Sequence, residues 1–176
     1  MKKYIILSVI TILFFVGCNK GESHTDSKKE TFFNKSSDME NKIYELEVII
    51  KEDTTQAINY YKLGTLYAKK KDWNKALENL EKSVTLDSHN PGPLNNIGNI
   101  HFTCGNVDLA IKNYQQAILV DSNHTDSHFN LAFAFAKTDR LNEAVKELNI
   151  VLKLDPDNAK AIKLRENIRE INQRRR

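Results

Sequence analysis

Cysteine and histidine side chains include the strongest candidates for nucleophiles or metal ligands in this chain. The 176 residues include two cysteines and five histidines. His124 and His128 are four residues apart, a spacing that can place two metal ligands on one helix face. However, His124 falls between two predicted helices, so we expect junction contacts rather than a metal site. Cys104 follows a predicted helix instead of standing at a helix N-terminus, where a thiolate would be stabilised, and we expect an inert thiol.

The sequence contains no motif of a known catalytic site. A Gly-rich phosphate loop, a Ser or Cys nucleophile with a suitable base, and a recognisable pair of acids are all missing. Two cysteines are too few for a disulfide framework or a cysteine-cluster metal site. The formal net charge of +3 is too small to indicate nucleic-acid binding. We therefore predict a protein that is not an enzyme and has no cofactor, metal, nucleic-acid partner or small-molecule substrate.

The first residues have the pattern of a secretory signal. Lys2 and Lys3 precede an apolar run from residue 4 to residue 16. As a helix this run would span about 20 Å, whereas the hydrocarbon core of a bilayer is about 30 Å thick. A stable transmembrane helix is therefore the weaker interpretation.

The end of this run, Phe15-Val16-Gly17-Cys18, resembles the lipobox of bacterial lipoproteins. The resemblance implies that residues 1–17 are cleaved as a signal peptide and that Cys18 is acylated. Phe15 departs from the usual Leu, and an uncleaved anchor or a differently cut signal are the alternatives. We expect a lipid-anchored protein of the bacterial cell envelope, facing the periplasm or the surface. Residues 18–36 are polar and charged, which predicts a flexible tether.

Internal repetition with a period of 34 residues organises the rest of the chain. The aligned columns hold large apolar residues (Leu63, Ile97, Leu131), small residues (Gly64, Gly98, Ala132, and Ala76, Ala110, Ala144) and a closing acid (Asp87, Asp121, Asp155). The units are 57–90, 91–124 and 125–158. Within each unit, two blocks of apolar residues at helical spacing are separated by a polar break, so each unit is predicted to be a helix hairpin.

These columns resemble the tetratricopeptide repeat, with Leu-Gly, an aromatic residue, Ala and a closing Asp-Pro, here complete only at Asp155-Pro156. The resemblance implies an all-α fold, a right-handed superhelical stack of three hairpins with flanking helices. The small columns would allow two backbones to approach closely. We predict a domain over 37–176, with an N-terminal helix at about 39–52, preceded by a capping-box pattern at Ser37–Glu40, and a capping helix at about 159–173.

In tetratricopeptide arrays the first helix of each hairpin lines a concave groove that holds a peptide or helix of a partner. The groove positions that the resemblance implies are Tyr61, Lys62, Thr65 and Lys69, then Asn95, Asn96, Asn99 and Phe102, then Phe129, Asn130, Phe133 and Lys137. Asn side chains can bond both the N–H and the C=O of an extended chain, and the aromatic residues could accept apolar side chains.

We therefore predict a protein–protein interaction module of a membrane-tethered lipoprotein, which binds a peptide or helix of a cell-envelope partner. The alternative is an assembly factor for an outer-membrane, secretion or pilus complex. The variant of this family that grips C-terminal carboxylates needs Lys or Arg at groove positions. This sequence has Tyr61, Thr65, Asp126 and Asn130 there and matches only at Asn96, so we do not expect that activity.

Overall fold

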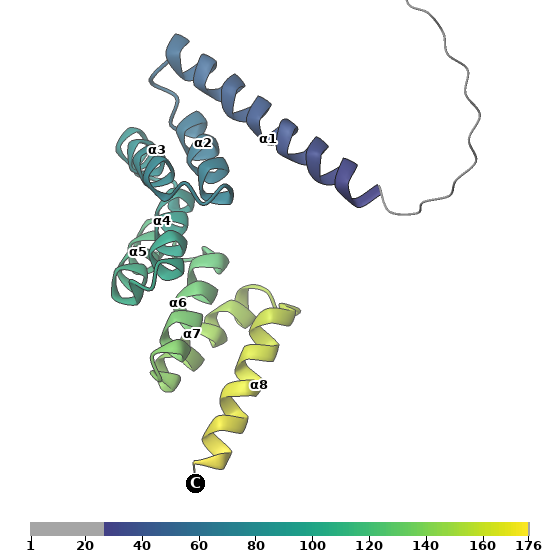
Figure 1. Cartoon of the computed structure of the whole chain (residues 1–176). Coiled ribbons are helices and arrows are strands. Elements are labelled where there is room, and N and C mark those ends of the chain that lie inside the picture. Colours follow the sequence, from purple (N-terminus) through teal and green to yellow (C-terminus); the bar gives the residue numbers. More distant parts are fainter. Residues whose placement is uncertain (1–26, 176) are drawn as a thin grey trace, which may run out of the picture. The chain divides into compact units, whose positions relative to one another are not determined.

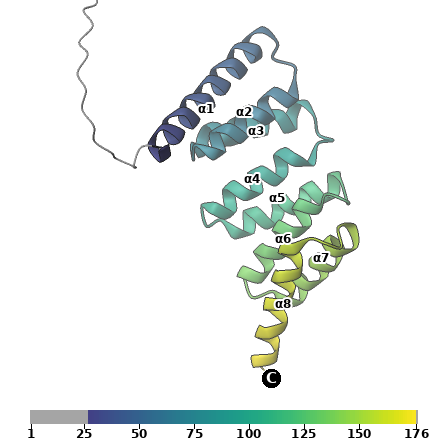
Figure 2. The same ribbon diagram turned by 90° about the vertical axis from the view of Figure 1, so that its right-hand side faces the viewer.

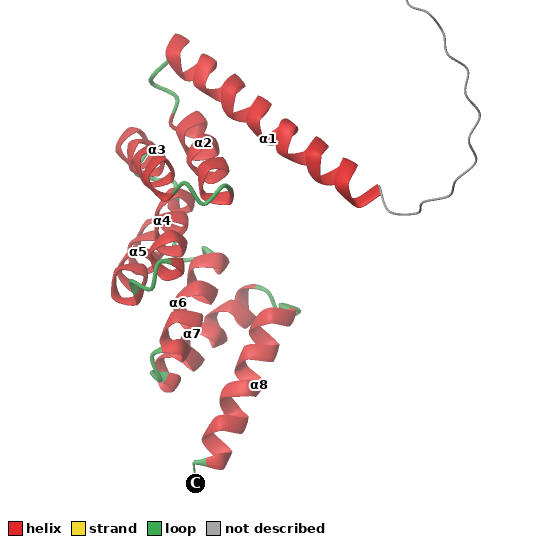
Figure 3. Ribbon diagram, in the orientation of Figure 1, coloured by secondary structure: helices red, strands yellow, loops and turns green. Residues whose placement is uncertain are grey.

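The computed structural model describes the backbone of residues 27–175 and the side chains of residues 38–175 (Figure 1). The predicted signal peptide, Cys18 and residues 18–26 of the predicted tether lie outside the described residues. The chain divides into two units, Met1–Ser36 and Ser37–Arg176, of which the second holds the repeats. Within the described range there are eight helices and no strand (Figure 3). None of these helices is long and apolar enough to cross a membrane.

Three helix hairpins follow one another at the predicted period. The helices are α1 (Ser27–Glu52), α2 (Ala57–Lys69), α3 (Trp73–Leu86), α4 (Pro91–Thr103), α5 (Val107–Val120), α6 (Thr125–Lys137), α7 (Leu141–Leu154) and α8 (Ala159–Arg174). The hairpins α2–α3, α4–α5 and α6–α7 stack in chain order (Figures 1 and 2), and α2 contacts α4, α4 contacts α6, and α6 contacts α8. The prediction of an all-α stack of hairpins is confirmed.

The hairpin turns are set by one residue in each repeat. Lys71, Gly105 and Asp139 have φ of 62°, 83° and 63°, so all three lie in the left-handed region. They are one repeat apart, which means that each hairpin reverses direction in the same way. Glycine adopts this conformation without strain, whereas the other two turns hold a non-glycine residue there.

Small residues allow the two helices of a hairpin to approach. A Cβ built on Gly98 would lie 2.5 Å from Cε1 of Tyr114, and one built on Gly64 would lie 2.8 Å from Cγ of Leu80. Tyr114 and Leu80 are among the largest fully buried side chains. The aromatic ring and the leucine therefore fill the space that the glycines leave, and this interlocking holds the first two hairpins closed.

The first helix begins earlier than predicted. α1 starts at Ser27 rather than at about residue 39, so residues 27–36, which we predicted to be part of the flexible tether, are helical. Consequently the capping-box pattern at Ser37–Glu40 lies inside the helix instead of starting it. Residues 27–38 contain no Gly or Pro, and extending a helix that is already nucleated costs little per residue.

Helices outside the repeats close the two ends of the second unit. In α1, Ile43 is buried in a core cluster with Leu63 and Tyr67 of α2. The hydroxyl of Tyr67 donates to Glu47 of α1 at 2.6 Å. At the other end, Ile168 of α8 is buried against the last hairpin. Each terminal helix thus covers the apolar face that a single hairpin would leave in water.

Candidate functional site

The predicted groove residues all come from α2, α4 and α6, which contact one another in that order. Most of their side chains are half-buried or exposed, as expected of a surface that could bind a partner. Asn95 is the exception, with 6% of its surface exposed. The structure therefore brings the central amide residues together and places one of them largely between the helices.

A network of side-chain amides joins α4 to α6. The Nδ2 group of Asn130 donates to Oδ1 of Asn95 at 3.0 Å and to Oδ1 of Asn99 at 3.1 Å. Ser127 donates to the same Asn95 oxygen at 3.2 Å, and Tyr114 donates to the same Asn99 oxygen at 2.9 Å. Burial raises the pKa of Tyr114 well above its usual range, so its hydroxyl keeps its proton and remains a donor. This network fixes the orientation of both acceptor amides.

A further side-chain hydrogen bond joins α2 to α4. The amide nitrogen of Asn96 donates to Oγ1 of Thr65 at 3.1 Å, and Thr65 donates to the carbonyl of Tyr61 at 2.8 Å. The Tyr61 hydroxyl would lie 2.8 Å from a Cβ built on Gly92, so glycine at the start of α4 leaves room for this ring. The bond from Asn96 to Thr65 thereby joins the two helices, and the Tyr61 carbonyl orients the Thr65 hydroxyl within α2.

Four amide groups remain without a partner among the described residues. They are the Nδ2 donors of Asn95 and Asn99 and the Oδ1 acceptors of Asn96 and Asn130. No side-chain N or O atom in the described part is both buried and unpaired, so these groups reach solvent. Donors and acceptors of this kind match the C=O and N–H groups of an extended peptide. The network that orients them is preorganised, which lowers the entropic cost of binding.

The aromatic residues form a half-buried patch beside the amides. The rings of Phe102 and Phe133 lie 5.5 Å apart at an angle of 53°. Phe102 and Phe129 pack against the core below them, and Nζ of Lys137 lies 5.4 Å above the ring of Phe133. The patch offers an apolar contact with a cation at its rim.

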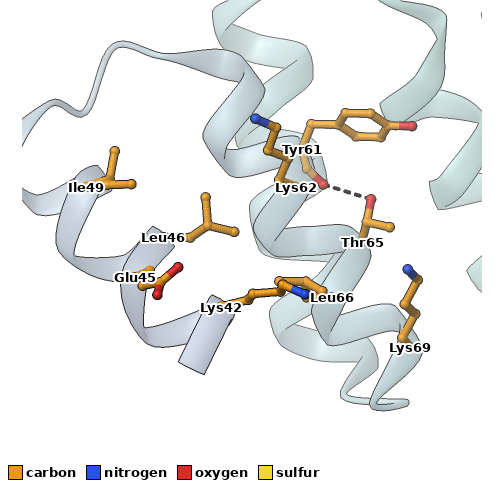
Figure 4. Close-up of a pocket in the computed structure, with 9 residues that line it drawn as sticks. All are labelled: Lys42, Glu45, Leu46, Ile49, Tyr61, Lys62, Thr65, Leu66 and Lys69. Atoms are coloured by element: carbon orange, nitrogen blue, oxygen red, sulfur yellow. Dashed lines mark hydrogen bonds between the residues drawn. The ribbon is translucent and has the colours of Figure 1, made fainter. Parts of the chain in front are cut away.

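Two cavities lie at the ends of this row of helices. One, of about 410 Å³, lies between α1 and α2 and is lined by Tyr61, Lys62, Thr65 and Lys69 together with side chains of α1 (Figure 4). The other, also of about 410 Å³, is lined by Phe129 and Asn130 together with Asp126, Asp155 and Asp157. The predicted residues therefore do not line one continuous cavity. Asn95, Asn96, Asn99, Phe102 and Phe133 line neither of these two cavities.

Sequence reasoning missed the contribution of α1 to the first cavity. Lys42, Leu46 and Ile49 line it from α1. Their spacing of four and three residues places them on one helix face, and this pattern was readable in the sequence. What could not be read was how α1 would lie against α2.

The histidine pair makes structural contacts. The Nδ1 atom of His128 lies 2.6 Å from Oε2 of Glu147, and its Nε2 atom lies 3.0 Å from the carbonyl of Ser122. His124 Nδ1 lies 2.7 Å from Oγ of Ser127. No group of three or more His, Cys, Asp or Glu residues suited to a metal ion occurs within the described range. Cys104 is exposed and forms no disulfide with another described residue.

Comparison with known families identifies the repeats. A model described as "TPR repeat" matches residues 98–139, and one described as "Tetratricopeptide repeat" matches residues 56–90 and 125–158. Together the matches cover more than half of the chain. The two matches of the second model agree to within one residue with the first and third units read from the sequence, whereas the match over residues 98–139 runs from the second unit into the third.

Two curated proteins are similar to this chain over the same region. The anaphase-promoting complex subunit CDC16 of Saccharomyces cerevisiae is 26% identical over 117 residues, which are 62% of this chain and 14% of that protein. The uncharacterized protein ycf37 of Guillardia theta is 30% identical over 105 residues, which are 57% of this chain and 59% of that protein. The chain thus spans less than two thirds of the length of either relative.

Solved structures share the fold. The first TPR domain of Spaghetti (RPAP3), bound to the HSP90 peptide SRMEEVD, has a TM-score of 0.65 and 22% identity, covering 69% of this chain and 98% of that one. The second TPR domain of human RPAP3, in complex with the HSP70 peptide SGPTIEEVD, has a TM-score of 0.60 and 25% identity, covering 64% and 94%. MamA has a TM-score of 0.63 and 18% identity, covering 87% and 98%.

Proposed function

The chain belongs to the tetratricopeptide-repeat family, and on this premise we propose that it binds an extended segment of a partner protein along α2, α4 and α6. The observation that carries this proposal is the row of oriented amide groups that remain free to bond. Asn99 and Asn95 present N–H donors, and Asn96 and Asn130 present acceptors. The half-buried rings of Phe102 and Phe133 beside them would receive apolar side chains.

Relatives with peptides bound support this role. Two domains of the same fold hold the peptides SRMEEVD and SGPTIEEVD. In this chain, the positions that would grip a terminal carboxylate carry Tyr61, Thr65, Asp126 and Asn130 instead of lysine or arginine. We therefore propose recognition of an internal stretch of backbone, in which amide bonds give affinity with modest dependence on sequence.

The sharpest test changes one free donor without disturbing the network. Asn99→Asp keeps the oxygen that accepts from Tyr114 and Asn130 but replaces the free N–H donor with a carboxylate oxygen. We expect recovery of the partner, after crosslinking in the native cell, to fall about tenfold, because a carbonyl would face an anion instead of a donor. Asn149→Asp, on an exposed position of α7, makes the same charge change elsewhere and should leave recovery unchanged.

The free energy of unfolding of both variants should differ from that of the wild type by less than about 0.5 kcal/mol, as for most surface substitutions. If folded Asn99→Asp recovers as much partner as Asn149→Asp, the amide row is not the binding surface.

We also propose that Cys18 carries a lipid that tethers the domain to a membrane of a bacterial cell envelope. The support is the signal-like segment and the lipobox-like residues 15–18. Cys18→Ala should abolish incorporation of radiolabelled palmitate and release the protein from the membrane fraction. If this variant still partitions with membranes, a different anchor holds the protein.

A further inference from the structure

The cavity between α1 and α2 combines an apolar floor with a basic rim (Figure 4). Leu46 of α1 and Leu66 of α2 line it from opposite walls, and Ile49 adds an apolar side chain that is 43% exposed. The lining residues span seven positions on α1 and eight on α2, which corresponds to about 11–12 Å along each helix. The cavity therefore has room for a few side chains of a bound peptide but not for a folded domain.

The charges around the cavity are unevenly balanced. Lys62 and Lys69 are exposed, and neither forms an ion pair with another described residue. Lys42 is already bonded to Asp38 at 2.6 Å. Glu45 is the single acidic residue among the lining side chains. Two exposed ammonium groups thus lie beside a partly apolar surface, where their attraction for an anion is weakened less by water than on an open surface.

The opposite end of the groove has the reverse charge. Asp126, Asp155 and Asp157 line the cavity next to Phe129, where Lys160 is the one basic lining residue. An acidic stretch of a bound segment would be repelled there and attracted at the α1–α2 end. The charge distribution therefore selects which end of the groove an acidic segment occupies.

We propose that the α1–α2 cavity binds a segment of a protein partner in which leucine-sized side chains are flanked by carboxylates. The leucine side chains lie against Leu46 and Leu66, and the carboxylates pair with Lys62 and Lys69. This inference rests on the proposed function, because Tyr61 and Thr65 belong to both surfaces. It adds the chemical class of the ligand and a binding element, α1, that lies outside the three repeats.

The test uses three synthetic peptides with blocked termini and a fluorescein label, so that only side chains differ. The first is Asp-Glu-Leu-Leu-Glu-Asp, the second has Ser in place of both Leu, and the third has Lys in place of the four acids. We expect fluorescence anisotropy to detect binding of the first peptide, with about tenfold weaker binding of each of the others. Raising the salt from about 50 to about 200 mM should weaken binding of the first peptide.

Variants of the full domain locate the site. Lys62→Glu with Lys69→Glu should weaken binding of the first peptide at least tenfold, and Ile49→Ser should weaken it several-fold. All three positions are exposed, so the fold is retained. Lys82→Glu, an exposed lysine of α3, is the matched control and should leave binding unchanged.

The outcomes separate this inference from the proposed function. If Asn99→Asp abolishes partner recovery but the first peptide binds no better than the other two, the amide groove stands and the assignment of the α1–α2 cavity is wrong. The assignment is equally wrong if the charge-reversed variant binds the peptide as the wild type does. It is also overturned if Lys62 and Lys69 are needed only for binding to vesicles that contain phosphatidylglycerol, because the cavity would then contact a lipid surface.

Discussion

Single residues decide how closely the helices of each hairpin approach. Gly98 lies under the ring of Tyr114, where an added Cβ would come within 2.5 Å of Cε1 of the ring. The ring has no free space to move into, since Tyr114 is 2% exposed and its hydroxyl is bonded to Asn99. The same side chain therefore supports both the core and the candidate site.

We expect Gly98→Ala to lower the free energy of unfolding by about 1–3 kcal/mol because of overpacking, although Ala has the better helix propensity. Urea denaturation followed by circular dichroism measures this change. Lys112→Ala, at an exposed position of α5, serves as the control and should change the free energy by less than about 0.5 kcal/mol. A Gly98→Ala protein as stable as this control would show that the ring can move aside.

The sequence predicts the positions of the groove asparagines but not their hydrogen-bond partners. Asn95, Asn96, Asn99 and Asn130 were expected to face the groove because of their positions in the repeat. Their hydrogen bonds could not be predicted, since Asn130 pairs with residues 31 and 35 positions away. Such pairing depends on the stacking of α4 against α6, which no local pattern encodes.

At the scale of helices, the terminal elements matter because they cover apolar faces that the repeats leave open. Ile168 of α8 is 1% exposed, whereas Ile171 on the same helix is 38% exposed. The two residues have the same side chain, so they isolate the effect of burial against the last hairpin.

We expect Ile168→Ala to destabilise the domain by about 2–5 kcal/mol, the range for a buried Ile shortened to Ala. Ile171→Ala should cost less than about 1 kcal/mol, because little of its surface is transferred from water. Thermal and urea unfolding of both variants make the comparison. Equal losses would mean that α8 is not held by the packing that closes the stack.

Most helices could be predicted from the sequence, but the start of α1 could not. Apolar periodicity and the 34-residue repeat located α2 to α7, because every repeat supplies an independent copy of the same pattern. α1 has no such copy, and its start at Ser27 follows from helix propagation rather than from a visible signal. The cavity that α1 forms with α2 was missed for the same reason.

Across the whole repeat domain, the α1–α2 cavity, the amide row and the cavity beside α8 follow one another along α2, α4 and α6. The end next to α1 carries two exposed lysines, and the end next to α8 carries three aspartates. A bound segment would therefore lie across all three helices in one preferred direction. Under the proposed function, binding would then be a property of the stack and not of any single hairpin.

Site-specific photocrosslinking in the native cell tests most simply whether a partner binds along α2, α4 and α6. A benzophenone amino acid is placed at Phe133, beside Phe102 in the groove, or at Leu119 of α5, which is 85% exposed. We expect a discrete crosslinked partner from position 133 and none from position 119. A partner captured from position 119 and not from position 133 would contradict this expectation.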